Sequence, residues 1–158
     1  VDLGWDVAAR GSRVYLAQGA SGLGVYEVNG QGQPTRVRTV RPGGVVRSVA
    51  VHGDLLATAQ VSGQVKLYRV GSAEQEVATI ASTGPVERVR FVGGQLWVLR
   101  KNGQGAEVYS VAEPTVPVRL GSIGTGARES FREVWMGARR YTYQGHEVTV
   151  EAVVGALP

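Results

Sequence analysis

The chain has 158 residues, 43% of them hydrophobic and 23 of them glycine, and it contains no cysteine, which excludes disulfides, thiolate metal sites and a cysteine nucleophile. It has no run of about 18 apolar residues and no charged stretch followed by an apolar block, so we expect neither a membrane span nor a signal peptide. The formal net charge is +4, but the basic residues, 15 of 17 of them arginine, are spread through every segment, which argues against a nucleic-acid site.

The first segment contains four predicted β-strands. Short runs rich in Val and aromatic residues are separated by clusters of Gly, Ser, Asn and Pro, which supply turn geometry. The predicted strands are Trp5–Ala9, Arg13–Gln18, Leu23–Val28 and Thr35–Val40. Four short strands in succession predict an antiparallel sheet.

The same pattern then repeats along the chain. Val7–Val28 aligns without gaps to Val49–Val70 at a constant offset of 42, and a third copy starts at Val89, with one extra residue in the turn at Asn102–Gly105. A period near 40 with four strands per unit is typical of β-propeller blades. The chain is therefore predicted to be one all-β propeller segment, with blades at about 4–44, 45–85 and 86–126.

The last copy, about 127–158, is degenerate. Only three strand-like segments are expected there: Glu129–Met136, Arg139–Tyr143 and Glu147–Val154. The prediction is thus three clear four-stranded antiparallel blades and one incomplete blade in an unfinished ring. Because open sheet edges invite pairing, we expect further blades, from the same or another chain, or a protein partner to complete it.

Repeat symmetry points to one candidate binding site. Residues at the start of the innermost strand of each blade should meet at the mouth of the central channel, and they differ between copies while the strand cores repeat. The candidates are Trp5, Asp6, Arg47, Glu87, Arg88, Phe131 and Arg132. The alternative is that Asp6 and Glu87 only pair with neighbouring arginines and seal the channel. Trp97 and Trp135 are candidate anchors for a partner, with core packing as the alternative.

The residues that usually carry chemistry are sparse. His52 and His146 are isolated, and His52 precedes a repeated glycine at a surface turn. The aspartates are Asp2, Asp6 and Asp54, which leaves no calcium loop, and the glycine-rich strings that contain Asn29 and Asn102 suit turns better than phosphate loops. We therefore expect no catalytic residue, no metal and no cofactor.

The repeat unit resembles that of the LVIVD family of bacterial and archaeal β-propeller repeats. The first copy carries the resemblance best, in GWDVAARGSRVYLAQGASGLGVYEV, and a proline-flanked outer strand at Ala112–Gly126 also fits. The resemblance covers about residues 4–126 and departs where Glu27, Arg69 and Ser110 replace an Asp. It implies a cell-surface or secreted setting, extracellular or in the cell envelope, and interaction roles.

These observations favour a non-catalytic propeller module that mediates protein–protein or cell-surface interaction as part of a larger assembly or a longer chain. The alternative is a ligand-binding or enzymatic propeller whose site is completed by blades outside this sequence.

Overall fold

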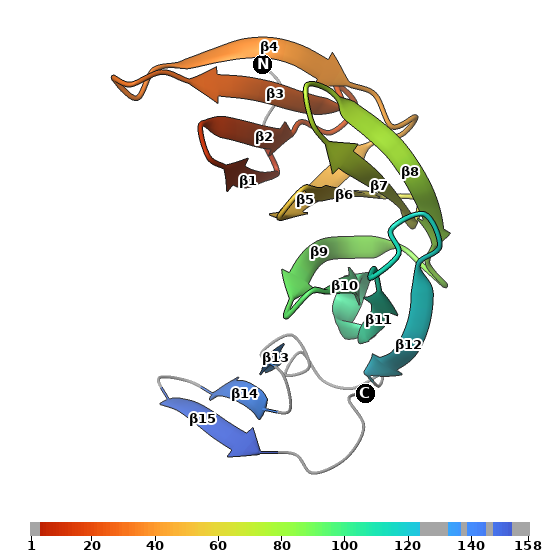
Figure 1. The fold of residues 1–158 in the computed structure, drawn as a ribbon. Helices are drawn as coiled ribbons and strands as arrows, with labels where there is room; N and C mark the ends of the chain where they lie inside the picture. Colours follow the sequence, from red (N-terminus) through yellow and green to blue (C-terminus); the bar gives the residue numbers. More distant parts are fainter. Residues whose placement is uncertain (1–3, 124–132, 137–138, 145–146, 153–158) are drawn as a thin grey trace.

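The computed structural model describes residues 4–123, 133–136, 139–144 and 147–152, which form four antiparallel sheets in chain order (Figure 1). We call the sheets blades 1 to 4. Blade 1 contains β1 (Asp6–Arg10), β2 (Arg13–Ala17), β3 (Leu23–Val28) and β4 (Pro34–Val40). Blade 2 contains β5 (Val46–His52), β6 (Leu55–Gln60), β7 (Gln64–Val70) and β8 (Glu74–Ala81).

Blade 3 contains β9 (Val86–Val92), β10 (Gln95–Arg100), β11 (Ala106–Ser110) and β12 (Val118–Ile123). Blade 4 has three strands among the described residues: β13 (Glu133–Met136), β14 (Arg139–Gln144) and β15 (Glu147–Ala152). A single-turn helix, η1 (Lys101–Gly103), occupies the extra turn of the third copy. In the described part of the chain, no helix is long and apolar enough to cross a membrane.

The backbone repeats as the sequence does. Gly11, Gly53 and Gly93 close the first hairpin of their blades with φ angles of 58°, 59° and 55°, in the left-handed region that favours glycine. The pairing of the third with the fourth strand is interrupted next to the repeated Tyr26 and Tyr68, and again next to Tyr109. The same irregularity at the same place in three blades means that the repeat extends to backbone geometry.

The blades follow one another along an arc. β1, β5 and β9, the first strands of blades 1 to 3, lie side by side on its concave side, and β4, β8 and β12 lie on its convex side (Figure 1). Blades 1 to 3 therefore contribute their first strands to a common inner surface, and residues at equivalent positions of these strands come close together.

The core lies between neighbouring blades. We call the face that a blade turns toward the preceding blade its front face, and the opposite face its rear face. The rear face of blade 1 carries four fully buried side chains: Tyr15, Ala17, Leu23 and Val25. They pack on the front face of blade 2: Val49, Leu56, Tyr68 and Val70.

Blades 2 and 3 pack in the same way. The buried residues on the rear face of blade 2 are at the positions equivalent to those on the rear face of blade 1: Ala57, Ala59, Val65 and Leu67. They pack on the front face of blade 3, at the positions equivalent to those on the front face of blade 2: Val89, Leu96, Tyr109 and Val111. Burial of such apolar faces stabilises a sheet by about 25 cal/mol per Å² of apolar surface removed from water. Each interface joins a rear face to a front face, so the core is a series of equivalent contacts.

Candidate functional site

Five of the predicted channel-mouth residues line one cavity. Trp5 immediately precedes β1, Asp6 begins it, Arg47 is the second residue of β5, and Glu87 and Arg88 follow the first residue of β9. Together they surround a cavity of about 200 Å³, which we call the mouth pocket. Neighbouring inner strands place these side chains together because each occupies nearly the same position in its blade. Phe131 and Arg132 lie outside the described residues.

One side of the mouth pocket is formed by weakly held side chains. Trp5 is 46% exposed, and the guanidinium carbon of Arg47 lies 5.4 Å from the centroid of its ring. An Nη2 atom of Arg47 also lies 4.0 Å from an Oε1 atom of Glu87, at the limit of an ion pair. Such exposed contacts contribute at most about 1 kcal/mol each. A ligand can therefore displace them at low cost.

Asp6 is held far more firmly. Its Oδ2 atom accepts hydrogen bonds from the Ser48 hydroxyl at 2.6 Å, the Val49 backbone N–H at 3.1 Å and the Arg90 guanidinium at 3.1 Å. Burial raises the pKa of the Asp6 carboxyl, but the hydrogen bonds from Ser48, Arg90 and Val49 outweigh it and leave the pKa below its ordinary value. The carboxylate therefore acts as a charged link between blades 1 and 2.

Ser48, the counterpart of Asp6 in blade 2, makes the equivalent link to blade 3. Its hydroxyl oxygen accepts a hydrogen bond from the Val89 backbone N–H at 3.1 Å, and its side chain is 1% exposed. In both cases a side-chain oxygen at the start of an inner strand binds a backbone N–H of the next inner strand. The links satisfy buried backbone donors that no ladder partner reaches.

The predicted ion pairs between acids and arginines are present, and they leave the mouth pocket open. Asp6 pairs with Arg90, and Glu87 lies near Arg47. Arg88 is exposed and pairs with no acidic side chain in the described ranges. The pocket thus has two engaged acids, an exposed aromatic ring and one guanidinium free to bind an anionic group.

A second, wider cavity of about 370 Å³ runs along the inner strands. Its lining comes from blades 1 to 3, and most of the lining residues are of apolar type: Val7, Ala8, Ala9, Val49, Ala50, Val51, His52, Arg90 and Phe91. His52 is exposed at the end of β5, where the sequence places a surface turn, and its ring centroid lies 5.8 Å from that of Phe91. His52 thus contacts the ring of Phe91 in blade 3 from an exposed position.

Trp97 does not fit the predicted role of a partner anchor. It is 3% exposed and packs with Val108, Val92 and Leu99 in a cluster of blade 3. A buried ring offers no surface to a partner, so core packing, the alternative, describes this residue. Trp135 lies in β13, and its side chain is outside the described part of the structure.

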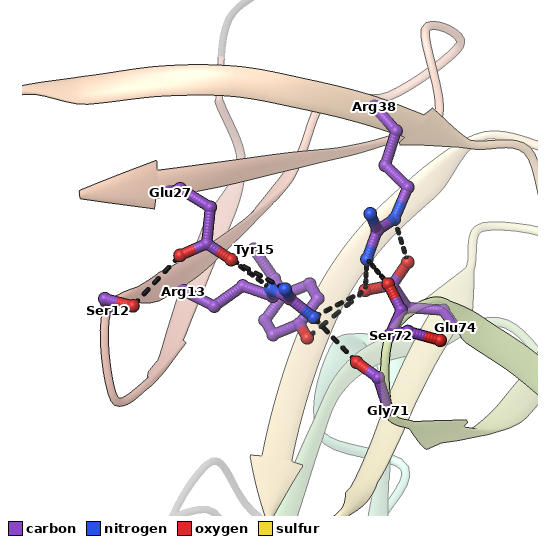
Figure 2. Close-up of polar contacts among 8 residues, drawn as sticks. All are labelled: Ser12, Arg13, Tyr15, Glu27, Arg38, Gly71, Ser72 and Glu74. Carbon is purple, nitrogen blue, oxygen red and sulfur yellow. Dashed lines mark hydrogen bonds and ion pairs between the residues drawn. The ribbon is translucent and has the colours of Figure 1, made fainter. Parts of the chain in front are cut away.

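A polar cluster that the sequence pattern did not predict joins blades 1 and 2. At its centre the Glu74 carboxylate, with its side chain 1% exposed, accepts hydrogen bonds from Arg38 at 2.5 Å and 2.9 Å (Figure 2). The Tyr15 hydroxyl points at the same carboxylate, with 3.4 Å between the oxygens, and Arg13 lies 3.8 Å from it. Arg13 also pairs with Glu27 at 2.6 Å.

Burial raises the pKa of Glu74, but the hydrogen bonds and charge of Arg38 more than offset it, so the pKa lies below its ordinary value. Burial also raises the pKa of Tyr15, and the charge on Glu74 adds to the effect. At neutral pH the Glu74 carboxylate is therefore charged while the Tyr15 hydroxyl keeps its proton, and the cluster acts as a clamp between blades 1 and 2. Alignment of the repeats does not indicate this cluster for two reasons. The residues that align with Tyr15 are Ala57 and Trp97, which have no hydroxyl. Glu74 lies beyond the aligned strands.

Within residues 4–123 and the described strands of blade 4, no group of three or more His, Asp or Glu side chains could hold a metal ion. Asp6 and Glu74, two of the carboxylates whose pKa values are lowered, already have basic partners. The arrangement of the described residues suits the binding of a charged group at the mouth pocket.

Comparison with known proteins defines the fold. No family model matches the chain, and no curated protein matches it. A chain in the crystal structure of the mitotic checkpoint complex aligns with a TM-score of 0.70 at 12% identity, over 96% of this chain and 49% of that one. The WD40 β-propeller domain of Doa1 aligns with a TM-score of 0.56 at 15% identity, over 94% and 51%.

Hydrazine synthase of Kuenenia stuttgartiensis aligns with a TM-score of 0.60 at 14% identity, over 93% of this chain and 45% of that one. At such identities the likeness shows the fold alone. The propeller neighbours and the three four-stranded antiparallel sheets confirm the predicted class, an all-β chain of propeller blades. The chain spans about half the length of these solved propeller chains.

Proposed function

We propose that the chain is a non-catalytic propeller module that binds a protein partner at the mouth pocket. The observation that carries this proposal is that one cavity holds a half-exposed Trp5 beside Arg88, which pairs with no acidic side chain among the described residues. Trp and Arg are the residue types that most often dominate protein–protein binding energy. They combine a large apolar surface with a rigid set of donors.

The size of the mouth pocket supports a peptide side chain as the bound group. Its volume of about 200 Å³ lies below the roughly 300–1,000 Å³ typical of small-molecule and cofactor sites. Asp6 and Glu87 already have arginine partners, so the free guanidinium of Arg88 favours an acidic side chain of the partner. A carboxylate there would complete a charge-assisted hydrogen bond while its neighbours pack on Trp5.

The test uses a random heptapeptide library displayed on phage, panned against the immobilised 158-residue chain. We expect enriched peptides to contain Asp or Glu, and synthetic copies to bind the Trp5→Ala and Arg88→Ala variants about 30-fold more weakly. Arg69→Ala is the matched control, because Arg69 has an exposed side chain paired with Asp54 in blade 2 and lies outside the pocket. Its binding should be unchanged.

Equal binding of the peptides to all variants would refute the mouth pocket as the site. Failure to enrich any peptide would favour the other candidate, a ligand-binding or enzymatic propeller whose site takes residues from further blades. One structural neighbour, hydrazine synthase, is an enzyme, and this is why a ligand-binding or enzymatic propeller is the second candidate.

The resemblance to LVIVD repeats extends the proposal to a cell-surface or secreted setting. Intact cells of the source organism would be treated with a membrane-impermeant, amine-reactive biotin reagent, which can reach the exposed Lys101. Labelling of the protein, or its recovery from the medium, is expected. Labelling only after lysis would contradict this setting.

A further inference from the structure

Val45 extends the exposed apolar surface of Trp5 beyond the mouth pocket. Val45 is 39% exposed and lies just before β5, two residues before Arg47. The Cε2 and Cζ2 atoms of Trp5 and a methyl carbon of Val45 lie 3.8–3.9 Å from one point, the position that a Cβ on Gly19 would take. Trp5 and Val45 are therefore neighbours on the surface. We call the surface formed by these two side chains the apolar rim.

Backbone hydrogen bonds hold the apolar rim in place. The N–H groups of Gly19 and Val46 each donate to the carbonyl oxygen of the other at 2.9 Å, which ties blade 1 to blade 2 beside the rim. The Val45 carbonyl oxygen accepts a hydrogen bond from the Val61 N–H at 3.0 Å. Gly19 is buried and has a φ of 60°, in the left-handed region that favours glycine. A surface fixed in this way loses little conformational freedom when it binds a partner.

The charge beside the rim selects an apolar side chain over a basic one. The Arg47 guanidinium carbon already lies over the Trp5 ring, 5.4 Å from its centroid. A Lys or Arg of the partner would meet this like charge at the place where a cation binds an aromatic ring. An apolar side chain removes the exposed surface of Trp5 and Val45 from water without meeting that repulsion.

We propose that the segment bound at the mouth pocket carries a large apolar side chain close to its acidic residue, and that this side chain packs on the apolar rim. The inference rests on the proposed function, because Arg88 must hold the acidic residue for the two side chains to act together. Trp5 lines the mouth pocket and also forms part of the rim, so both anchors belong to one short segment. Residues two apart in an extended segment project to the same side roughly 7 Å from each other, so we expect a separation of about one to three residues.

The first test compares the peptides that phage panning enriches on the wild-type chain and on Val45→Asn. On the wild-type chain we expect Leu, Ile, Met, Phe, Tyr or Trp at one fixed spacing from Asp or Glu, about threefold above the unselected library, with Lys and Arg depleted there. On Val45→Asn the acidic residue should still be enriched, while the apolar preference is lost. Val37→Asn is the matched control, because Val37 is 44% exposed in β4 and outside the mouth pocket; it should keep both preferences.

The second test measures the affinity of one enriched synthetic peptide by fluorescence polarisation. Replacing its apolar residue with Ser, or Val45 with Asn, should each weaken binding about tenfold. The two changes together should weaken it little more than either alone, because both remove the same contact. The change in the peptide leaves the protein intact, so it tests the rim independently of the folding of Val45→Asn.

The outcomes separate this inference from the proposed function. If Arg88→Ala weakens binding but Val45→Asn and the Ser peptide do not, the apolar rim is overturned and the mouth pocket stands. If Arg88→Ala has no effect, or if no peptide is enriched, both proposals fail.

Discussion

The clamp between blades 1 and 2 leads to the sharpest prediction about stability. In Glu74→Gln the side chain keeps its shape but loses the charge that pairs with Arg38 through two hydrogen bonds. Hydrogen bonds to charged groups contribute about 1.5–3 kcal/mol, and the 31% exposure of the Arg38 side chain favours the lower end because solvent screens the pair. We expect a loss of about 2 kcal/mol, or roughly 4–8 °C in melting temperature.

The assay is urea and thermal unfolding followed by circular dichroism at pH 7. Glu76→Gln is the matched control, because Glu76 lies two residues away on β8 and forms its ion pair with Lys66 at 45% exposure. The control should change the free energy of unfolding by less than about 0.5 kcal/mol. If the two variants differ by less than this amount, the Glu74 clamp does not stabilise the interface and our reasoning is wrong.

Three further predictions concern the links, the buried acids and one turn. Ser48→Ala leaves the Val89 N–H without its acceptor and should lower the free energy of unfolding by about 1–3 kcal/mol in urea titrations. Three buried or partly buried carboxyls have lowered pKa values: Asp6, Glu74 and Glu107. The ionised carboxylates stabilise the fold fully above their ordinary pKa values of 3.8 and 4.5, and this stabilisation is lost as the pH falls through their lower pKa values in the folded protein. The urea concentration at the unfolding midpoint should therefore fall as the pH is lowered below about 5. The fall should be smaller in Glu74→Gln, which lacks one of these carboxylates. Gly22→Ala would place a Cβ 2.6 Å from the Val40 carbonyl oxygen at a φ of 92°, and its melting temperature should fall well below that of Gly11→Ala, whose Cβ meets nothing within 4 Å.

The blade architecture could be predicted because repetition amplifies weak signals. A single strand such as Leu23–Val28 has an ambiguous pattern, but Gln64–Val70 and Ala106–Ser110 repeat its spacing and its Tyr. The predicted Leu23–Val28 matches the observed strand, the predicted second and fourth strands of blade 1 differ by one residue at one end, and the predicted first strand is shifted by one residue. Such end residues depend on turn hydrogen bonds that residue type alone does not determine.

The mouth pocket could also be located by symmetry, because equivalent strand positions converge wherever blades stack. Pairing of Asp6 and Glu87 with arginines was one of the two alternatives that the sequence left open, but the particular partners could not be predicted. Asp6 is engaged by Ser48 and Arg90, contacts that depend on how far adjacent inner strands are shifted along each other. The Glu74 clamp escaped prediction for the opposite reason: it has no counterpart in the other repeats, and its two sides are 36 residues apart in the sequence.

The pairing of unlike faces gives the chain a direction. Because rear faces pack on front faces, a stack of such blades ends in a front face on one side and a rear face on the other. A blade added at either end leaves the same kind of face exposed there. Contacts of this kind form a ring only when the accumulated rotation returns to its starting point; otherwise they continue as a fibre. The side chains packed between the blades differ in volume from one interface to the next, since Tyr15 of blade 1 has the small Ala57 as its counterpart in blade 2. A change in the volume of one such side chain is therefore expected to alter the stacking of the two sheets that it separates as well as the stability of the chain.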